Sequence, residues 1–231
     1  MEALLNNPNA AGWYVPYAAI RTECYAMLAS LLGQSPSDET IGILQNLNWD
    51  AVIPGRLDRA LSALREAACG LTPAGIEAEY RRLFVGVGCG EMVPYASWYR
   101  ERMIQSSPLA ALRADLMRLG IVREADSHES KDHAAALCEI MALLSREAGG
   151  TSHAAQADFF KKHIASWMMR FFKDLRSAKN ADFYRDVASF GSCFLEAESE
   201  YLNCDVTMEI PIQEGGLRNE RRNYRQPADI H

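Results

Sequence analysis

Apolar side chains recur at every third or fourth position through most of this chain, and this spacing constrains the fold more than any other feature. Ile20, Cys24, Leu28 and Leu31 form one such stripe. Each stripe would lie along one face of an α-helix, because an α-helix has 3.6 residues per turn. Strict alternation of apolar and polar residues, which is typical of a half-buried strand, is not evident before Cys204. The sequence therefore predicts an all-α fold.

Capping residues, prolines and glycines divide these stripes into separate helices. Ser37 or Asp38 can cap the helix that follows them. Thr72-Pro73 and Ser107-Pro108 each place a capping side chain before a proline at the first helical position. Gly70 and Gly120 each end a helix. The expected helices cover residues of about 17–32, 41–47, 57–69, 73–84, 95–104 (a short helix or turn), 108–119, 129–148, 153–175 and 181–202.

The character of the chain changes after Cys204. The stretch VTMEIPI alternates, which is the pattern of a strand or an extended arm, and the basic stretch LRNERRNYRQP follows it. We therefore expect an all-helical domain at residues 14–204 and a C-terminal arm at residues 205–231. The domain is predicted to be a compact helical bundle of two lobes, at about residues 14–120 and 131–204, joined by a hinge at residues 121–130.

The composition argues against several classes of protein. The net charge of −6 argues against a general nucleic-acid binder and favours a basic partner. We expect no stable membrane insertion, because no apolar run is long enough to span a bilayer, and no secretory signal is evident. The six cysteines are scattered, which indicates reduced thiols in a cytoplasmic protein rather than a zinc site. The glycine-rich stretch GVGCGEMVP lacks the G-K-[ST] ending of a P-loop, so it predicts a connection and no cofactor.

The most unusual polar cluster consists of Glu129, Asp132 and His133, which read E-x-x-D-H. Spacings of three and four residues would place all three on one turn at the start of a helix. His163 and Trp167 lie four residues apart on the next expected helix, so one face would carry both. Two histidines and four carboxylates lie between residues 124 and 133, which is more than helix capping requires.

This cluster supports three interpretations besides capping. Histidines and carboxylates are the side chains of a metal or acid–base site, but their spacing fits no closed motif such as H-E-x-x-H. A helical scaffold that binds a folded partner elsewhere is a second interpretation. The third is peptide binding, because an acidic patch beside aromatic residues is complementary to a basic-then-apolar peptide. We favour peptide binding, and we keep the metal-dependent enzyme and the scaffold as alternatives.

Four segments of the sequence, in this order and spacing, resemble the TorD/DmsD/NarJ family of redox-enzyme maturation chaperones. The similarity is nearer to the TorD and DmsD branches, and it covers most of residues 17–202. The segments are Glu79-Tyr80-Arg81-Arg82-Leu83-Phe84 with Pro94-Tyr95-Ala96-Ser97-Trp98-Tyr99, the E-x-x-D-H motif, Phe159-Phe160-Lys161-Lys162-His163 running to Trp167, and Phe183-Tyr184 with Phe194-Leu195-Glu196.

The resemblance implies a non-enzymatic, cytoplasmic function. Members of the family bind the twin-arginine signal peptide, and often the body, of the catalytic subunit of a molybdopterin enzyme, and they delay export until the cofactor is inserted. Some relatives exchange helical halves at the hinge, so the resemblance leaves a homodimer open, including a domain-swapped one. The residues that it implicates in peptide binding are Glu129, Asp132, His133, Tyr80, Phe84, Pro94, Ser97, Trp98, His163 and Trp167.

The sequence departs from the family pattern at two places. Ser130 follows Glu129 where relatives commonly carry proline, which predicts a less rigid helix start. The tail beyond Cys204 is longer than the family pattern implies. It contains Arg221-Arg222-Asn223-Tyr224, which is similar to the twin-arginine pattern R-R-x-aromatic but lacks the apolar run that should follow. We interpret it as a solvated basic tail.

Overall fold

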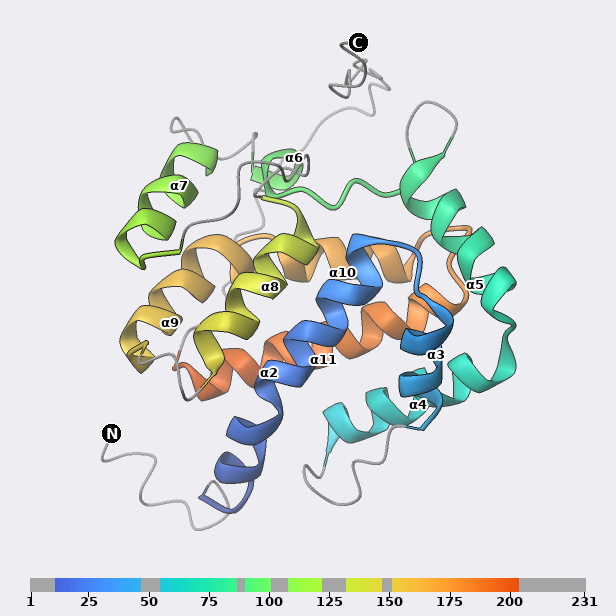
Figure 1. Cartoon of the computed structure of the whole chain (residues 1–231), viewed down its shortest axis with the longest axis horizontal. Helices are drawn as coiled ribbons and strands as arrows, with labels where there is room; N and C mark the ends of the chain where they lie inside the picture. Colours follow the sequence, from blue (N-terminus) through green and yellow to red (C-terminus); the bar gives the residue numbers. More distant parts are fainter. Residues whose placement is uncertain are drawn as a thin grey trace, which may run out of the picture.

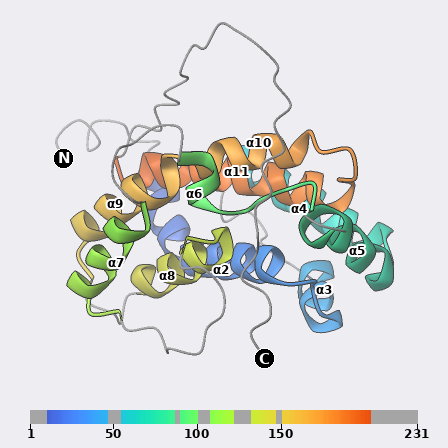
Figure 2. The ribbon, with the colours of Figure 1, turned by 90° about the horizontal axis from the view of Figure 1, so that it is seen from above.

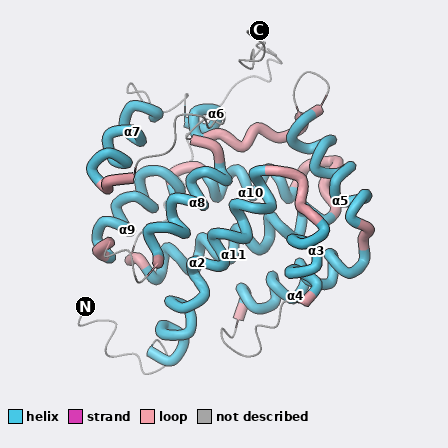
Figure 3. The backbone as a smooth tube through the Cα atoms, in the orientation of Figure 1, coloured by secondary structure: helices cyan, strands magenta, loops and turns pink. Residues whose placement is uncertain are grey.

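Helices account for the regular structure of the described part of the chain. The computed structural model describes residues 11–46, 55–86, 90–100, 108–121, 132–146 and 151–203. No strand occurs in these residues, and the predicted all-α class is confirmed (Figure 3). The helices, with η for a π-helical turn, are α2 (Ala11–Gly33), α3 (Asp38–Gln45), α4 (Arg56–Gly70), α5 (Pro73–Tyr80), η1 (Arg81–Val85), α6 (Ala96–Arg100), α7 (Pro108–Arg118), α8 (Ala134–Ser145), α9 (His153–Phe160), η3 (Lys161–Ala165), α10 (Met168–Arg176) and α11 (Phe183–Tyr201).

The helices form two layers. Helices α2 and α8 lie side by side in one layer, and α10 and α11 pair in the layer behind it (Figures 1 and 2). A Cβ atom added at Gly33 would lie 3.2 Å from the Cβ of Ala135, so α2 passes close to the start of α8. Apolar side chains from all these helices meet in one continuous buried cluster. Burial of this apolar surface is the main favourable contribution to folding.

Three helix boundaries follow the predicted capping chemistry. The hydroxyl of Ser37 accepts a hydrogen bond from the amide of Thr40 at 3.1 Å, at the start of α3. The hydroxyl of Thr72 accepts one from Gly75 at 3.2 Å, with Pro73 at the first position of α5. Gly120 follows α7 with a φ angle of +68°, a conformation that suits glycine. These boundaries depend on local contacts, which is why the sequence predicts them.

The start of α8 differs from the prediction. The helix was expected to begin near Glu129 and to include Asp132 and His133, but it begins at Ala134 and ends at Ser145. His133 has extended backbone angles, φ −66° and ψ 142°, and its ring caps the helix. The carbonyl of Asp132 accepts the amide of Ala96 instead of starting the helical hydrogen-bond series. Pairing with a distant segment therefore prevailed over local helix propensity at these residues.

The second difference is a break in the helix expected at residues 153–175. The chain forms α9, the π-helical turn η3, and α10 as separate pieces. Trp167 leaves the helical conformation, with φ −148° and ψ −31°. Its indole Nε1 donates a hydrogen bond to the carbonyl of His163 at 2.7 Å, which satisfies a backbone group that the break would otherwise leave unpaired.

A buried ion pair joins both layers of the fold. Glu198 on α11 accepts hydrogen bonds from the guanidinium of Arg21 at 2.6 and 3.0 Å, and from the hydroxyls of Tyr17 and Tyr25 at 2.8 and 2.7 Å. The Arg21 guanidinium also donates to Gln156 on α9 at 3.0 Å. A buried charge is tolerated only when it is paired and hydrogen-bonded, so this network specifies how α2, α9 and α11 pack.

Two further carboxylates hold the turn between α10 and α11. Glu79 is buried and accepts the amides of Asp182, Phe183 and Tyr184 at 2.8, 3.1 and 2.8 Å. Glu91 accepts the amides of Lys179 and Asn180 at 2.6 and 3.1 Å, and these bonds lower its pKa although partial burial acts in the opposite direction. The segment from α5 to α6 is thereby attached to the far end of the chain.

Gly90 shows why the glycine-rich stretch contains glycine. A Cβ atom at Gly90 would lie 2.3 Å from the carbonyl oxygen of Leu83, which is closer than real Cβ atoms approach backbone. The amide of Met92 also donates to that carbonyl at 2.7 Å. Close backbone packing therefore explains the glycine here, in agreement with the predicted connection.

Several predicted features lie outside the described residues. They are Glu129, nearly all of the hinge, and the arm beyond Asn203. The division into two lobes stays a prediction, and α2 from the first expected lobe packs along α8 from the second. In the part of the chain that is described, no helix has the length and apolar character needed to cross a membrane.

Candidate functional site

Two of the predicted segments meet in a short antiparallel bridge between Tyr95 and His133. The amide of Ala134 donates to the carbonyl of Pro94 at 2.8 Å, and the amide of Ala96 donates to the carbonyl of Asp132 at 3.0 Å. We call residues 94–98 and 132–134 the bridge site. It joins the start of α6 to the start of α8, although the two segments are separated by more than 30 residues of sequence.

Asp132 stabilises the start of α6. Its Oδ2 atom accepts the amide of Ser97 at 2.9 Å, so it caps a helix from a distant part of the chain. A carboxylate at a helix N-terminus is favourable because the free amides there carry partial positive charge. The residue is only 2% exposed. Its carboxylate therefore orients α6 and is shielded from solvent.

His133 has a similar positioning role at the start of α8. Its Nδ1 atom accepts the amide of Ala135 at 3.2 Å. Its ring lies 4.8 Å from the ring of Tyr95, nearly perpendicular to it. The imidazole is buried, like Asp132. The motif pair thus fixes two helix starts against each other.

Helix α6 presents one aromatic side chain inward and one outward. Tyr99 is buried, with its ring 5.4 Å from Trp167 and 6.2 Å from Phe171. Trp98, the next residue toward the N-terminus, is 51% exposed. A half-exposed tryptophan on an anchored helix is available to contact a partner, and tryptophan is enriched at the energetic centres of interfaces.

His163 and Trp167 come together as predicted, but they are buried beneath α6 and α7. The Nε2 atom of His163 lies 2.8 Å from Oδ2 of Asp115 on α7. Burial lowers the pKa of His163, and the hydrogen bond to Asp115 opposes that shift. Arg118 and Lys162 complete an ionic cluster with Asp115 and Asp158 around this histidine.

Tyr80 and Phe84 belong to a different cluster. Their rings lie 5.0 Å apart, and both pack on Tyr184 of α11, at 6.0 and 5.2 Å. Both side chains are half-buried. The structure thus brings Pro94, Ser97, Asp132 and His133 together, with Trp98 beside them, and it places Tyr80 and Phe84 elsewhere.

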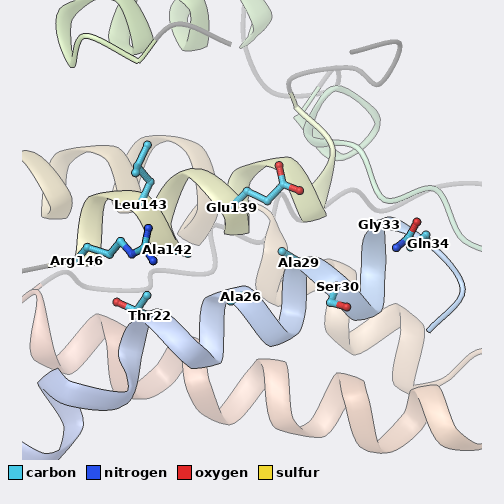
Figure 4. Close-up of a pocket in the computed structure, with 10 residues that line it drawn as sticks. All are labelled: Thr22, Ala26, Ala29, Ser30, Gly33, Gln34, Glu139, Ala142, Leu143 and Arg146. Carbon is cyan, nitrogen blue, oxygen red and sulfur yellow. The ribbon is translucent and has the colours of Figure 1, made fainter. Parts of the chain in front are cut away.

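An open groove of about 600 Å³ runs between α2 and α8 (Figure 4). Small side chains, including Ala26, Ala29 and Ala142, line much of it, and Glu139 of α8 and Arg146, the residue after α8, also line it. No local motif in the sequence marks this groove, because it depends on how the two helices pack.

The described residues offer no support for a metal site. They contain no group of three His, Cys, Asp or Glu side chains that could hold a metal ion. Two of the candidate ligands, His128 and Glu129, lie outside this part of the chain. Cys24 and Cys138 are buried free thiols, and burial raises the pKa of both.

A match to a known protein family covers three of the four motif segments. Residues 51–173, just over half of the chain, match the model of the nitrate reductase delta subunit family. The chain therefore belongs to this family, which comprises the NarJ/TorD redox-enzyme maturation chaperones. Its members are non-catalytic and bind the catalytic subunits of molybdoenzymes.

The chain is similar to solved structures, and a search of curated proteins gave no match. One of these structures is a protein from Archaeoglobus fulgidus described as a redox enzyme maturation protein. The sequence identity is 18% and the TM-score is 0.48, over 77% of this chain and 94% of that chain.

Proposed function

We propose that this chain is a cytoplasmic chaperone that binds the twin-arginine signal peptide and the apo catalytic subunit of a molybdopterin oxidoreductase. Binding would delay export until the cofactor is inserted. The observation that carries the proposal is the bridge site, because it assembles four of the residues that the family resemblance implicates and holds Trp98 exposed beside them.

The burial of Asp132 and His133 defines their role in this proposal. Oδ2 of Asp132 and Nδ1 of His133 accept the amides of Ser97 and Ala135, so both side chains would act by positioning α6 and α8. Trp98 would contact the apolar part of the peptide. Glu129, three residues before Asp132, would supply the carboxylate for the leader arginines, since charge-assisted bonds to arginine are strong and geometrically specific.

Helix α8 leads from the bridge site toward the α2–α8 groove. It begins at Ala134 within the bridge and carries Glu139 and Ala142 into the α2–α8 groove. A peptide longer than the bridge site could therefore continue along the groove, with its small side chains against the alanines.

Titration calorimetry with a twin-arginine leader from a neighbouring molybdoenzyme gene tests the proposal. The control is the same peptide with both arginines changed to alanine. We expect saturable binding that weakens when the arginines are removed, and that also weakens with added salt because exposed ion pairs are screened. Equal binding of both peptides, or no binding of either, would contradict the proposal.

A further inference from the structure

The exposed face of η3 and α10 carries almost only positive charge. We call this surface the basic face. The exposed positions between residues 161 and 176 are Lys161, Lys162, Ser166, Arg170, Lys173, Asp174 and Arg176. Lysine or arginine occupies all but two of them. The concentration stands out because the net charge of the chain is −6.

The orientation of the basic face is fixed by the side chains opposite it. The inward positions of the same stretch are apolar or buried: His163, Ile164, Ala165, Trp167, Met168, Phe171, Phe172 and Leu175. Helix α10 packs along α11 and touches α6 (Figures 1 and 2). A helix anchored in this way cannot turn its charged side chains toward the core, so they remain available on the surface.

Most of this positive charge is not neutralised within the fold. Lys162 pairs with Asp158 at 2.8 Å, and the carboxylate of Asp174 accepts the hydroxyl of Tyr99. In the described part of the chain, no carboxylate lies at ion-pair distance from Lys161, Arg170 or Lys173. A helix that uses charge only for its own stability pairs opposite signs four residues apart, as Glu77 and Arg81 do at 2.7 Å. Charge of one sign on one helix face repels itself and favours an acidic partner.

An exposed aromatic side chain lies on the neighbouring helix. Tyr99 of α6 contacts both Trp167 and Asp174, which places α6 beside the basic face. Trp98 on the same helix is half-exposed. Trp98, which the proposed function assigns to the leader, therefore marks the edge at which the leader site adjoins the basic face.

We infer that the basic face is a docking surface for an acidic segment of the catalytic subunit body, distinct from the site for its leader. This inference rests on the proposed function. A protein segment fits better than a nucleic acid or an anionic bilayer, because the face is one helix wide and the net charge of −6 would repel an extended polyanion. The chaperone would then hold leader and body by separate surfaces, which raises the overall affinity through effective concentration.

Charge reversal with a matched control tests the inference. The test variant is Lys161→Glu/Arg170→Glu/Lys173→Glu. The control variant, Arg65→Glu/Arg82→Glu/Arg113→Glu, changes the net charge by the same amount at exposed positions on α4, η1 and α7. Each protein is titrated with three probes: a neighbouring molybdoenzyme catalytic subunit purified without cofactor and without its leader, a ten-residue polyglutamate peptide, and the leader peptide alone.

We expect the test variant to bind the leaderless subunit about tenfold more weakly than the control variant does, since each reversed rim charge contributes a modest amount. Polyglutamate binding should be lost in the test variant only, and leader affinity should stay within about twofold in both.

Equal affinity of the two variants for the leaderless subunit, or no binding of that subunit by the native chain, would overturn the inference. So would binding of phosphatidylglycerol vesicles in place of the subunit. Leader binding that fails in the native chain, while subunit binding still depends on the basic face, would contradict leader recognition and leave this inference standing.

Discussion

The bridge site and the basic face use polar side chains in opposite ways. At the bridge site, Asp132 and His133 are buried and give their polar atoms to amides of the same chain. On the basic face, Lys161, Arg170 and Lys173 are exposed, and no carboxylate of the described residues lies at ion-pair distance from them. The buried pair of the E-x-x-D-H motif therefore positions the bridge site, while the exposed lysines and arginines of the basic face belong to no motif.

This difference separates positioning from contact. A buried carboxylate that accepts backbone amides affects stability strongly, and it affects binding only through the geometry that it maintains. An exposed lysine or tryptophan contributes little to stability and can contribute much to binding. The following predictions test that separation, beginning with the largest expected change in stability.

Removing the Glu79 carboxylate should cause the largest loss of stability. Glu79→Ala leaves the amides of Asp182, Phe183 and Tyr184 without their acceptor at a buried helix start. We expect the free energy of unfolding to fall by about 3 kcal/mol, measured by urea denaturation. The neighbouring Glu77→Ala is the control, because Glu77 is exposed and its ion pair with Arg81 is worth less than about 0.5 kcal/mol. Similar losses in the two variants would contradict the structural role of Glu79.

Asp132→Ala should lower the free energy of unfolding by about 2 kcal/mol, which is less than the loss expected for Glu79→Ala, because only one amide of α6 loses its cap. Hydrogen exchange should become faster at the start of α6 and remain unchanged in α11. Uniform acceleration across the molecule would mean that Asp132 supports the whole core and does not act on α6 in particular.

Lowering the pH should show how much His163 contributes to the free energy of unfolding. Its pKa in the folded chain lies below the ordinary value of 6.5, so the unfolded chain binds a proton first as the pH falls. Its contribution to stability is therefore complete above pH 6.5 and is lost as the pH falls below that value, by at most about 1.4 kcal/mol per pH unit. His163→Gln keeps a donor for Asp115, and the variant should lose less stability than the native chain between pH 7 and pH 5. Parallel pH profiles for the two proteins would contradict this assignment.

Trp98→Ala should have the smallest effect on stability, within about 0.5 kcal/mol, because the side chain is half-exposed. The same substitution should weaken leader binding by about tenfold. Phe171→Ala, a buried aromatic beside Tyr99, is the contrasting case and should destabilise the fold by about 3 kcal/mol. A large loss of stability in Trp98→Ala would show that this residue is part of the core.

Local contacts explain what the sequence predicts correctly. The caps at Ser37 and Thr72 and the glycine after α7 act within a few residues, so their effect is visible in the sequence. Asp132 behaves differently, because the amide that it caps lies 35 residues away along the chain. Helical spacing predicted that Asp132 lies inside α8. In the structure it lies before the helix, because it pairs with a distant segment.

The candidate site shows the same limit. The resemblance to the chaperone family identified Pro94, Ser97, Asp132 and His133, and the structure brings them together. It gave no indication of Glu79 as a helix cap, since the partners lie 103 to 105 residues away. The sequence did not indicate the basic face either, because its exposed lysines and arginines belong to no motif and become one surface only when the helix is packed.

The most direct test of this account is the leader affinity of Asp132→Asn compared with that of Asp132→Ala, measured by calorimetry under conditions where both variants are folded. Asparagine removes the charge but keeps an oxygen that can accept the amide of Ser97. If Asp132 positions α6, Asp132→Asn should bind the leader nearly as tightly as the native chain, and Asp132→Ala should bind it far more weakly. If Asp132→Asn loses as much affinity as Asp132→Ala, the carboxylate meets the leader arginines directly, and the positioning role is wrong.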